Sequence, residues 1–192
     1  MLRVLPALPF RRLGILSLAL LLSGSTTCGL MPRARALELG GSTLFVRAPW
    51  KAQLISYDTT VGSGPVTWYL TLSLDAGAGA SLGQVSVQQS RGSDWNFQFS
   101  PELTKAFLGR PRQQGRSLPV RASFDQRTRL LSVTFPEPVP PGETVTVALR
   151  PWNNPVTADT YQFQVMVWPA GPNPQASPVG TTTLRIYERY LF

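Results

Sequence analysis

Apolar and polar residues alternate along most of this chain, and this period of two constrains the fold more than any other feature. The clearest run is Val66-Thr-Trp-Tyr-Leu-Thr-Leu-Ser-Leu74, in which Val66 and every second residue after it are apolar. Neighbouring side chains of a strand point to opposite faces of a sheet. The run therefore predicts a half-buried strand with Trp68 in the core.

Shorter runs of the same kind predict further strands, and residues that favour turns separate them. Gly62-Ser-Gly-Pro65 and Pro140-Pro-Gly142 are two such turns, because Gly and Pro supply the backbone angles that tight turns need. The further strands are expected at residues 52–57, 84–89, 95–99, 119–124, 130–135, 144–150, 160–168 and 182–187. Many short strands at this spacing predict an all-β fold, an immunoglobulin-like antiparallel β-sandwich.

One short helix is expected to interrupt the strands. Ser100, followed by proline, is a suitable N-cap, and Gly109 fits the position after the last turn. These signals predict one or two helical turns over residues 101–108. The helix is expected to cover the core at one end of the sandwich with Leu103 and Phe107.

The first 36 residues have the three-part plan of a secretory signal peptide. Three arginines precede an apolar run over residues 13–22, and Ala34-Arg35-Ala36 follows. We predict cleavage after Ala36 and a single domain over residues 37–192. The apolar run is about half of the roughly 20 residues that a spanning helix needs, so no spanning membrane helix is expected in the mature chain.

Removal of this segment changes the charge of the chain. The segment takes with it five arginines and no acidic residue, so the formal charge falls from +8 to +3. A mildly basic, exported domain lacks the strong positive footprint of most nucleic-acid-binding proteins, and we expect no nucleic-acid partner. The final compartment stays open among the periplasm or cell envelope, the thylakoid lumen and the exterior.

The residue types present exclude much catalytic chemistry. The chain has no histidine, and its one cysteine, Cys28, falls within the predicted signal peptide. Zinc and copper sites built from imidazole or thiolate are therefore excluded, as are Ser-His-Asp and Cys-His machinery. The acidic residues are scattered singly, without the cluster of a calcium loop. We expect no catalytic residues, no metal and no cofactor.

A basic segment is the first candidate contact with a partner. It includes Arg110, Arg112 and Arg116, whose guanidinium groups suit phosphate or carboxylate groups. A solvated loop over residues 110–116 is the simpler interpretation of the same arginines.

The second candidate contact lies among prolines and consists of Trp152, Asn153 and Asn154. Trp152 is suited to stacking on a glycan or another partner, and packing beneath a neighbouring loop is the alternative.

Several stretches resemble a known family. "FPEPVPPGETVTVALRPWNNP", "TYQFQVMVWPAGPNP" and "PVGTTTLRIY" look like the C-terminal half of a family of exported cyanobacterial proteins classed as a domain of unknown function. "LGQVSVQQSRGSDWNFQF" and "LLSVTF" fit the same pattern. The resemblance implies a signal peptide followed by one β-rich domain in a cyanobacterial envelope. It implies no catalytic or ligand-binding residue.

These features predict a non-enzymatic binding or structural module that contacts an envelope protein, a glycan or an anionic lipid. A second hypothesis is an envelope enzyme that uses carboxylates alone, such as a glycan hydrolase with two carboxyl groups in one cleft. A third is a small outer-membrane barrel, suggested by the C-terminal "YERYLF".

Overall fold

The computed structural model of this protein describes residues 37–39 and 41–189. The predicted signal peptide over residues 1–36, with Cys28, lies outside the described residues, and so does the C-terminal Phe192.

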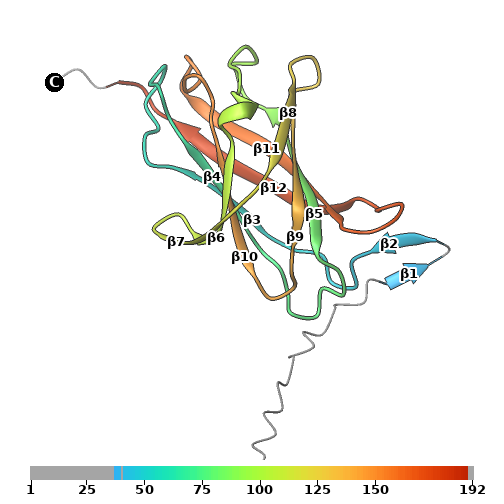
Figure 1. The fold of residues 1–192 in the computed structure, drawn as a ribbon. Helices are drawn as coiled ribbons and strands as arrows, with labels where there is room; N and C mark the ends of the chain where they lie inside the picture. Colours follow the sequence, from blue (N-terminus) through green and yellow to red (C-terminus); the bar gives the residue numbers. More distant parts are fainter. Residues whose placement is uncertain (1–36, 40, 190–192) are drawn as a thin grey trace, which may run out of the picture. The chain divides into compact units, whose positions relative to one another are not determined.

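Two five-stranded antiparallel sheets face each other across one core (Figure 1). The sheet that we call the β4 sheet has the order β3 (Ala52–Ser56), β4 (Trp68–Ser73), β10 (Thr144–Leu149), β6 (Lys105–Arg110) and β7 (Gln113–Leu118). The β11 sheet has the order β12 (Ser177–Ile186), β11 (Asp159–Pro169), β5 (Leu82–Arg91), β9 (Leu130–Val139) and β8 (Arg121–Asp125). A separate pair joins β1 (Leu37–Leu39) to β2 (Ser42–Leu44). The predicted immunoglobulin-like β-sandwich is confirmed.

The core is centred on Trp68, as its place in the alternating run predicts. This side chain is fully buried, and its ring centroid lies 5.5 Å from those of Phe97 and Phe99 and 5.6 Å from that of Phe163. Tilted and edge-on aromatic pairs at this spacing add to the free energy gained from burial. On β11, Tyr161, Phe163 and every second residue through Val167 point inward, so the period of two holds on both sheets.

Tyr161 closes one end of the sandwich. Its side chain is buried near the start of β11, and its hydroxyl donates a hydrogen bond to the carbonyl of Thr157 (2.8 Å). A tyrosine that bonds back to the chain a few residues upstream is a recurrent feature of immunoglobulin-like sandwiches. Burial raises the pKa of Tyr161 to about 12.

The predicted helix is wrong beyond its first turn. A single 3-10 turn spans Pro101–Leu103, Ser100 makes no side-chain cap, and β6 starts at Lys105. Pairing of β6 with β10 explains the difference, because ladder hydrogen bonds to a central strand outweigh local helix signals. Leu103 is half-exposed, and Phe107 lies on the outer face of the sheet, outside the core cluster that it was expected to cover.

Two other expectations need correction. Residues 95–99 form no strand and contribute only an isolated bridge between Phe99 and Pro151. The arginine-rich segment over residues 110–116, expected as a solvated loop, belongs to the hairpin formed by β6 and β7. The arginines therefore sit on a paired element with a defined direction.

Candidate functional site

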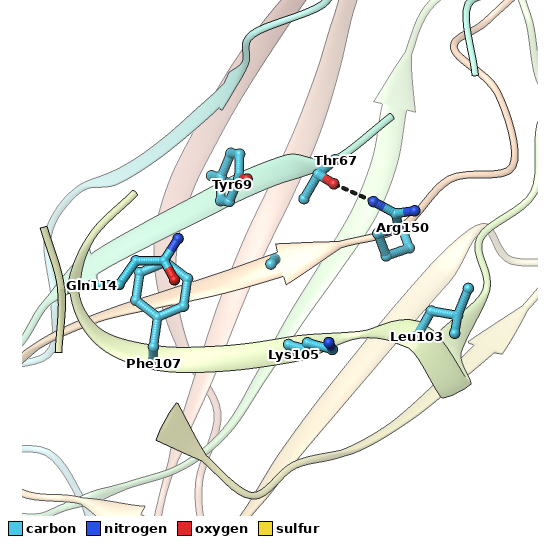
Figure 2. Close-up of a pocket in the computed structure, with 8 residues that line it drawn as sticks. Thr67, Tyr69, Leu103, Lys105, Phe107, Gln114 and Arg150 are labelled. Carbon is cyan, nitrogen blue, oxygen red and sulfur yellow. Dashed lines mark hydrogen bonds between the residues drawn. The ribbon is translucent and has the colours of Figure 1, made fainter. Parts of the chain in front are cut away.

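A hollow of about 340 Å³ lies on the outer face of the β4 sheet (Figure 2). We call it the outer-face groove. It is lined by Thr67, Tyr69, Leu103, Lys105, Phe107, Gln114, Ala148 and Arg150.

Strand alternation places these side chains in the groove. Tyr69 on β4 and Ala148 on β10 are register partners, and both stand on the face opposite the core. On β6, Lys105 and Phe107 alternate with Ala106, which is buried in the core. Figure 2 shows Lys105 and Phe107 on one strand, among the residues that line the groove. One sheet thus fills the core with one face and lines the groove with the other.

The β6–β7 hairpin bends over this outer face. Its tip reaches the far strand, because the guanidinium carbon of Arg112 lies 4.9 Å from the ring centroid of Tyr57, just beyond β3. The Thr146 hydroxyl donates to the carbonyl of Gly109 (2.7 Å), which ties the hairpin to β10. Gly109 has φ +94°, and a Cβ there would lie 2.3 Å from the carbonyl oxygen of Gln113. The close approach of the two hairpin strands therefore requires glycine.

Positive charge dominates the outer face. Lys105 and Arg150 line the groove, and Arg110 and Arg112 line a second hollow of about 360 Å³ beneath the hairpin tip. Among the described residues, neither hollow is lined by a carboxylate. Arg150 donates to the hydroxyl of Thr67 (2.5 Å), which fixes its head group at the rim (Figure 2). Cations without carboxylate neighbours suit a ligand that carries negative charge.

Arg116, the third predicted arginine, has a different environment. Its Nη1 lies 3.1 Å from Oε2 of Glu137, and both side chains are largely exposed. An exposed pair of this kind contributes little free energy of folding, but it neutralises the charge of Arg116. The structure therefore separates Arg116 from the cations that line the two hollows.

The second predicted contact lies at the end of the sandwich where several loops gather (Figure 1). Trp152 is 59% exposed and Asn153 is exposed, and both line a hollow of about 270 Å³. We call it the end cavity. It shares no lining residue with the outer-face groove. Arg110 and Arg112 thus line a different hollow from Trp152 and Asn153, and Arg116 lines neither of the two.

Asn154 is only 1% exposed and acts as a structural centre. Its Oδ1 accepts a hydrogen bond from Nε1 of Trp68 (2.9 Å), and its Nδ2 donates to the carbonyls of Asp58 (3.0 Å) and Thr60 (2.9 Å). The side chain thus joins the core tryptophan to the loop after β3. A buried amide with these partners has no free group for a ligand.

Sequence reasoning missed the residues that form the groove. The local signals predict a helix over residues 101–108, with Phe107 on the core, and place Arg150 at the end of a strand, so they identify none of Lys105, Phe107 and Arg150 as a contact residue. The run Lys105-Ala-Phe-Leu108 does not alternate between polar and apolar residues, so its sequence carries no clear strand signal.

Five aspartates of the described chain accept hydrogen bonds in turns and loops, namely Asp58, Asp75, Asp94, Asp125 and Asp159. The pKa values of Asp58, Asp125 and Asp159 are lowered, chiefly by hydrogen bonds from Ser63, Thr128 and Ser93 respectively. A general acid needs a raised pKa instead. Asp159 and Glu188 do line one shallow hollow, but Asp159 already accepts bonds from Ser93 and Thr160. Over the described residues, no cluster of three or more acidic side chains suits a metal ion.

The fold is an immunoglobulin-like β-sandwich, because two antiparallel sheets enclose one core and loops gather at one end. The hydrogen bond from the Tyr161 hydroxyl to the carbonyl of Thr157 is typical of the same class. Residues 42–186 match the family described as "Protein of unknown function (DUF2808)", and the chain belongs to that family. No curated protein has a matching sequence. Within the part of the chain that the structure describes, no helix has the length and apolar character to cross a membrane.

Several solved structures of bacterial proteins have a distant similarity to this chain. The collagen-binding domain of a Staphylococcus aureus adhesin is 9% identical, with a TM-score of 0.39 over 71% of this chain and 94% of that one. The collagen-binding subdomain of the Enterococcus faecalis surface protein ACE is 12% identical, with a TM-score of 0.41 over 72% and 98%. An uncharacterised immunoglobulin-like protein from Nocardia farcinica is 11% identical, with a TM-score of 0.44 over 70% and 96%. Similarity at this level concerns the fold alone.

Proposed function

We propose that this protein is an exported, non-enzymatic module of the cell envelope that binds an anionic partner in the outer-face groove. The observation that carries the proposal is the pairing of two cations, Lys105 and Arg150, with two aromatic side chains, Tyr69 and Phe107, in one hollow. Cations attract phosphate or carboxylate groups, and the ring of Tyr69, with the 7% of Phe107 that is exposed, contacts the apolar parts of the same ligand.

The hairpin extends the positive surface beyond the groove. Arg110 and Arg112 line the neighbouring hollow on the same face of the sheet. The tilted rings of Tyr57 and Tyr69 pack there with 5.6 Å between their centroids. A chain-like ligand with repeated negative charges would contact both hollows at once, which multiplies weak individual contacts. Anionic envelope glycans, anionic lipid headgroups and acidic protein segments all have this chemistry.

We propose binding rather than catalysis because of the side chains that line the groove. The groove offers cations, aromatic rings, one amide and hydroxyl groups, but no carboxylate among its described lining. Export rests on the predicted signal peptide over residues 1–36 and on the resemblance to exported cyanobacterial proteins. Cleavage after Ala36 would leave the binding domain intact, because the sandwich strands begin at β3.

Binding to three anionic probes tests the proposal. Polyglutamate, alginate and vesicles containing phosphatidylglycerol are each titrated against the purified protein and against the double variant Lys105→Glu with Arg150→Glu. We expect saturable binding of at least one probe, a loss of about tenfold or more in the double variant, and weaker binding at high salt because exposed charges are screened.

A matched charge change elsewhere serves as the control. Arg121→Glu with Arg127→Glu changes the net charge by the same amount on the β8 strand and turn of the other sheet. We expect this variant to bind nearly as well as the unmodified protein. Equal losses in the two double variants would mean that net charge, and not the groove, determines binding.

A further inference from the structure

The end cavity is built from two loops that a single carboxylate holds together. Residues 94–98 form one wall and residues 152–156 the other. Oδ1 of the buried Asp94 accepts a hydrogen bond from the backbone N–H of Asn96 (2.8 Å), and Oδ2 accepts one from Val156 (2.9 Å). The backbone N–H of Trp152 also donates to the carbonyl of Gln98 (2.9 Å). The cavity therefore has fixed walls.

A third loop fixes the tip that carries the exposed side chains. The backbone N–H of Asn154 donates to the carbonyl of Ser63 (2.7 Å). The next residue of that loop, Gly64, lies so close that an added Cβ would be 2.1 Å from Oδ1 of Asn153 and 2.7 Å from the carbonyl oxygen of Trp152. Only glycine allows this approach. The side chains of Trp152 and Asn153 thus stand on a braced turn rather than on a free loop.

Phe97 forms the bottom of the cavity, and Arg129 packs against its ring. Phe97 is buried and lines the cavity, and the guanidinium carbon of Arg129 lies 4.5 Å from its ring centroid. Arg129 is itself buried, and its Nε donates to Oε1 of Gln89 (3.2 Å). This packing keeps an apolar surface at the bottom of a hollow whose rim is polar.

Three uncharged amides face the cavity and are free to bind a ligand. Asn96, Gln98 and Asn153 each carry a side-chain amide, and none of the three amides is hydrogen-bonded to another described residue. An amide both donates and accepts, which matches a sugar hydroxyl. The exposed indole of Trp152 offers a flat apolar surface beside them.

The side chains that line the cavity do not favour an anionic ligand. No cation lines it among the described residues, and Asp94, its one carboxylate, has both oxygens committed to backbone N–H groups. A pyranose ring has an apolar C–H face for the indole and hydroxyl groups at its edge for the amides. We propose that the end cavity is a binding site for a neutral saccharide ring, distinct from the anionic site in the outer-face groove.

Tryptophan fluorescence and saturation-transfer NMR with three neutral probes test this site. Cellotetraose, chitotetraose and maltotetraose are titrated against the purified protein. We expect at least one to bind with a Kd at or below about 1 mM. Trp152→Ala should weaken that binding about tenfold or more, because an aromatic anchor dominates a small interface. Asn153→Ala should weaken it about three- to tenfold through a lost hydrogen bond.

Trp50→Ala is the matched control, since Trp50 is 84% exposed and lines none of the hollows described above. We expect it to leave saccharide binding unchanged, and we expect all three variants to keep the unfolding midpoint of the unmodified protein within a few degrees. No saturable response to any of the three saccharides, or equal losses in Trp152→Ala and Trp50→Ala, would overturn the proposal.

The two sites are tested independently. Lys105→Glu with Arg150→Glu should weaken binding of the anionic probes about tenfold or more and leave saccharide binding unchanged. Trp152→Ala should weaken saccharide binding and leave binding of the anionic probes unchanged. Loss of saccharide binding in the groove variant would contradict a separate site, whether or not the anionic probes bind.

Discussion

Neighbouring asparagines in one turn have opposite roles. Asn154 is buried and makes three side-chain hydrogen bonds, whereas Asn153 is exposed at the rim of the end cavity. The two residues are identical in chemistry and adjacent in sequence. Their difference comes from the direction in which each side chain leaves the turn.

Replacing these asparagines one at a time separates the two roles. Asn154→Ala leaves Nε1 of Trp68 without a partner and removes one hydrogen bond from the carbonyls of Asp58 and Thr60. We therefore expect a loss of about 2–4 kcal/mol in the free energy of unfolding. Asn153→Ala should change it by no more than about 0.5 kcal/mol, as is usual for exposed side chains. Urea unfolding measures both values. Similar losses in the two variants would contradict the structural role of Asn154.

Tyr161 links stability to alkaline pH. Its pKa is raised to about 12 from an ordinary value of 10.0, because burial disfavours the phenolate. The unfolded state therefore loses this proton first, so the contribution of the neutral phenol is complete below about pH 10 and is lost as pH rises toward 12. Tyr161→Phe should cost about 1 kcal/mol at neutral pH through the lost bond to Thr157. The difference in free energy of unfolding between Tyr161→Phe and the unmodified protein should become smaller at high pH. Urea unfolding at several pH values measures this difference, and a constant difference would contradict the raised pKa.

At the scale of the element, the β6–β7 hairpin shows that the choice between helix and strand decides which side chains line the groove. If residues 101–108 were a helix, Phe107 would cover the core, as the sequence signals suggested. As a strand paired with β10, the same segment turns Ala106 inward and Phe107 outward. Lys105 then joins Phe107 in the groove.

Gly109 is the position at which the hairpin can be tested. Gly109→Ala adds a Cβ close to the carbonyl oxygen of Gln113, so the two hairpin strands must separate. We expect a loss of about 1–3 kcal/mol in stability together with weaker binding of the anionic probes. Gly180→Ala on β12 is the control, because Gly180 also has a positive φ (+118°) but open space around its Cβ position.

The control should lose some stability from backbone strain and keep its binding. Thermal unfolding and the same titrations compare the two variants. Unchanged binding in a folded Gly109→Ala protein would show that the hairpin tip has no part in the groove.

At the scale of the whole molecule, acid should destabilise the sandwich. Asp58, Asp125 and Asp159 have lowered pKa values, through hydrogen bonds from Ser63, Thr128 and Ser93, so the folded state binds their protons more weakly than the unfolded state does. Their contribution is complete above the ordinary value of 3.8 and is lost as pH falls through the lowered values.

Replacement of all three carboxylates by amides should flatten this dependence. In Asp58→Asn, Asp125→Asn, Asp159→Asn, we expect a lower stability at neutral pH and a smaller further loss between about pH 4 and pH 2. Urea unfolding midpoints across that range measure how steeply stability depends on pH. Equal slopes in the variant and the unmodified protein would show that other groups account for acid unfolding.

The sequence by itself determined the class of fold and much of the core. The period of two in residues 66–74 and 160–168 predicted which side chains are buried, because a strand has only two faces and one of them must exclude water. Trp68 and the inward set on β11 follow from that rule. The turn hydrogen bonds that Asp75 and Asp125 accept are also local, because each joins residues only two positions apart.

Only the tertiary structure decided where the candidate sites lie. Local signals favoured a helix over residues 101–108, and the pairing of β6 with β10 outweighed them. Nothing in the sequence relates Arg112 to Tyr57, or Asp94 to Val156, because these contacts join residues far apart in the chain. Strand order and loop packing bring such residues together, and both depend on the free energy of the whole sandwich rather than of any segment. The groove and the end cavity are products of that assembly.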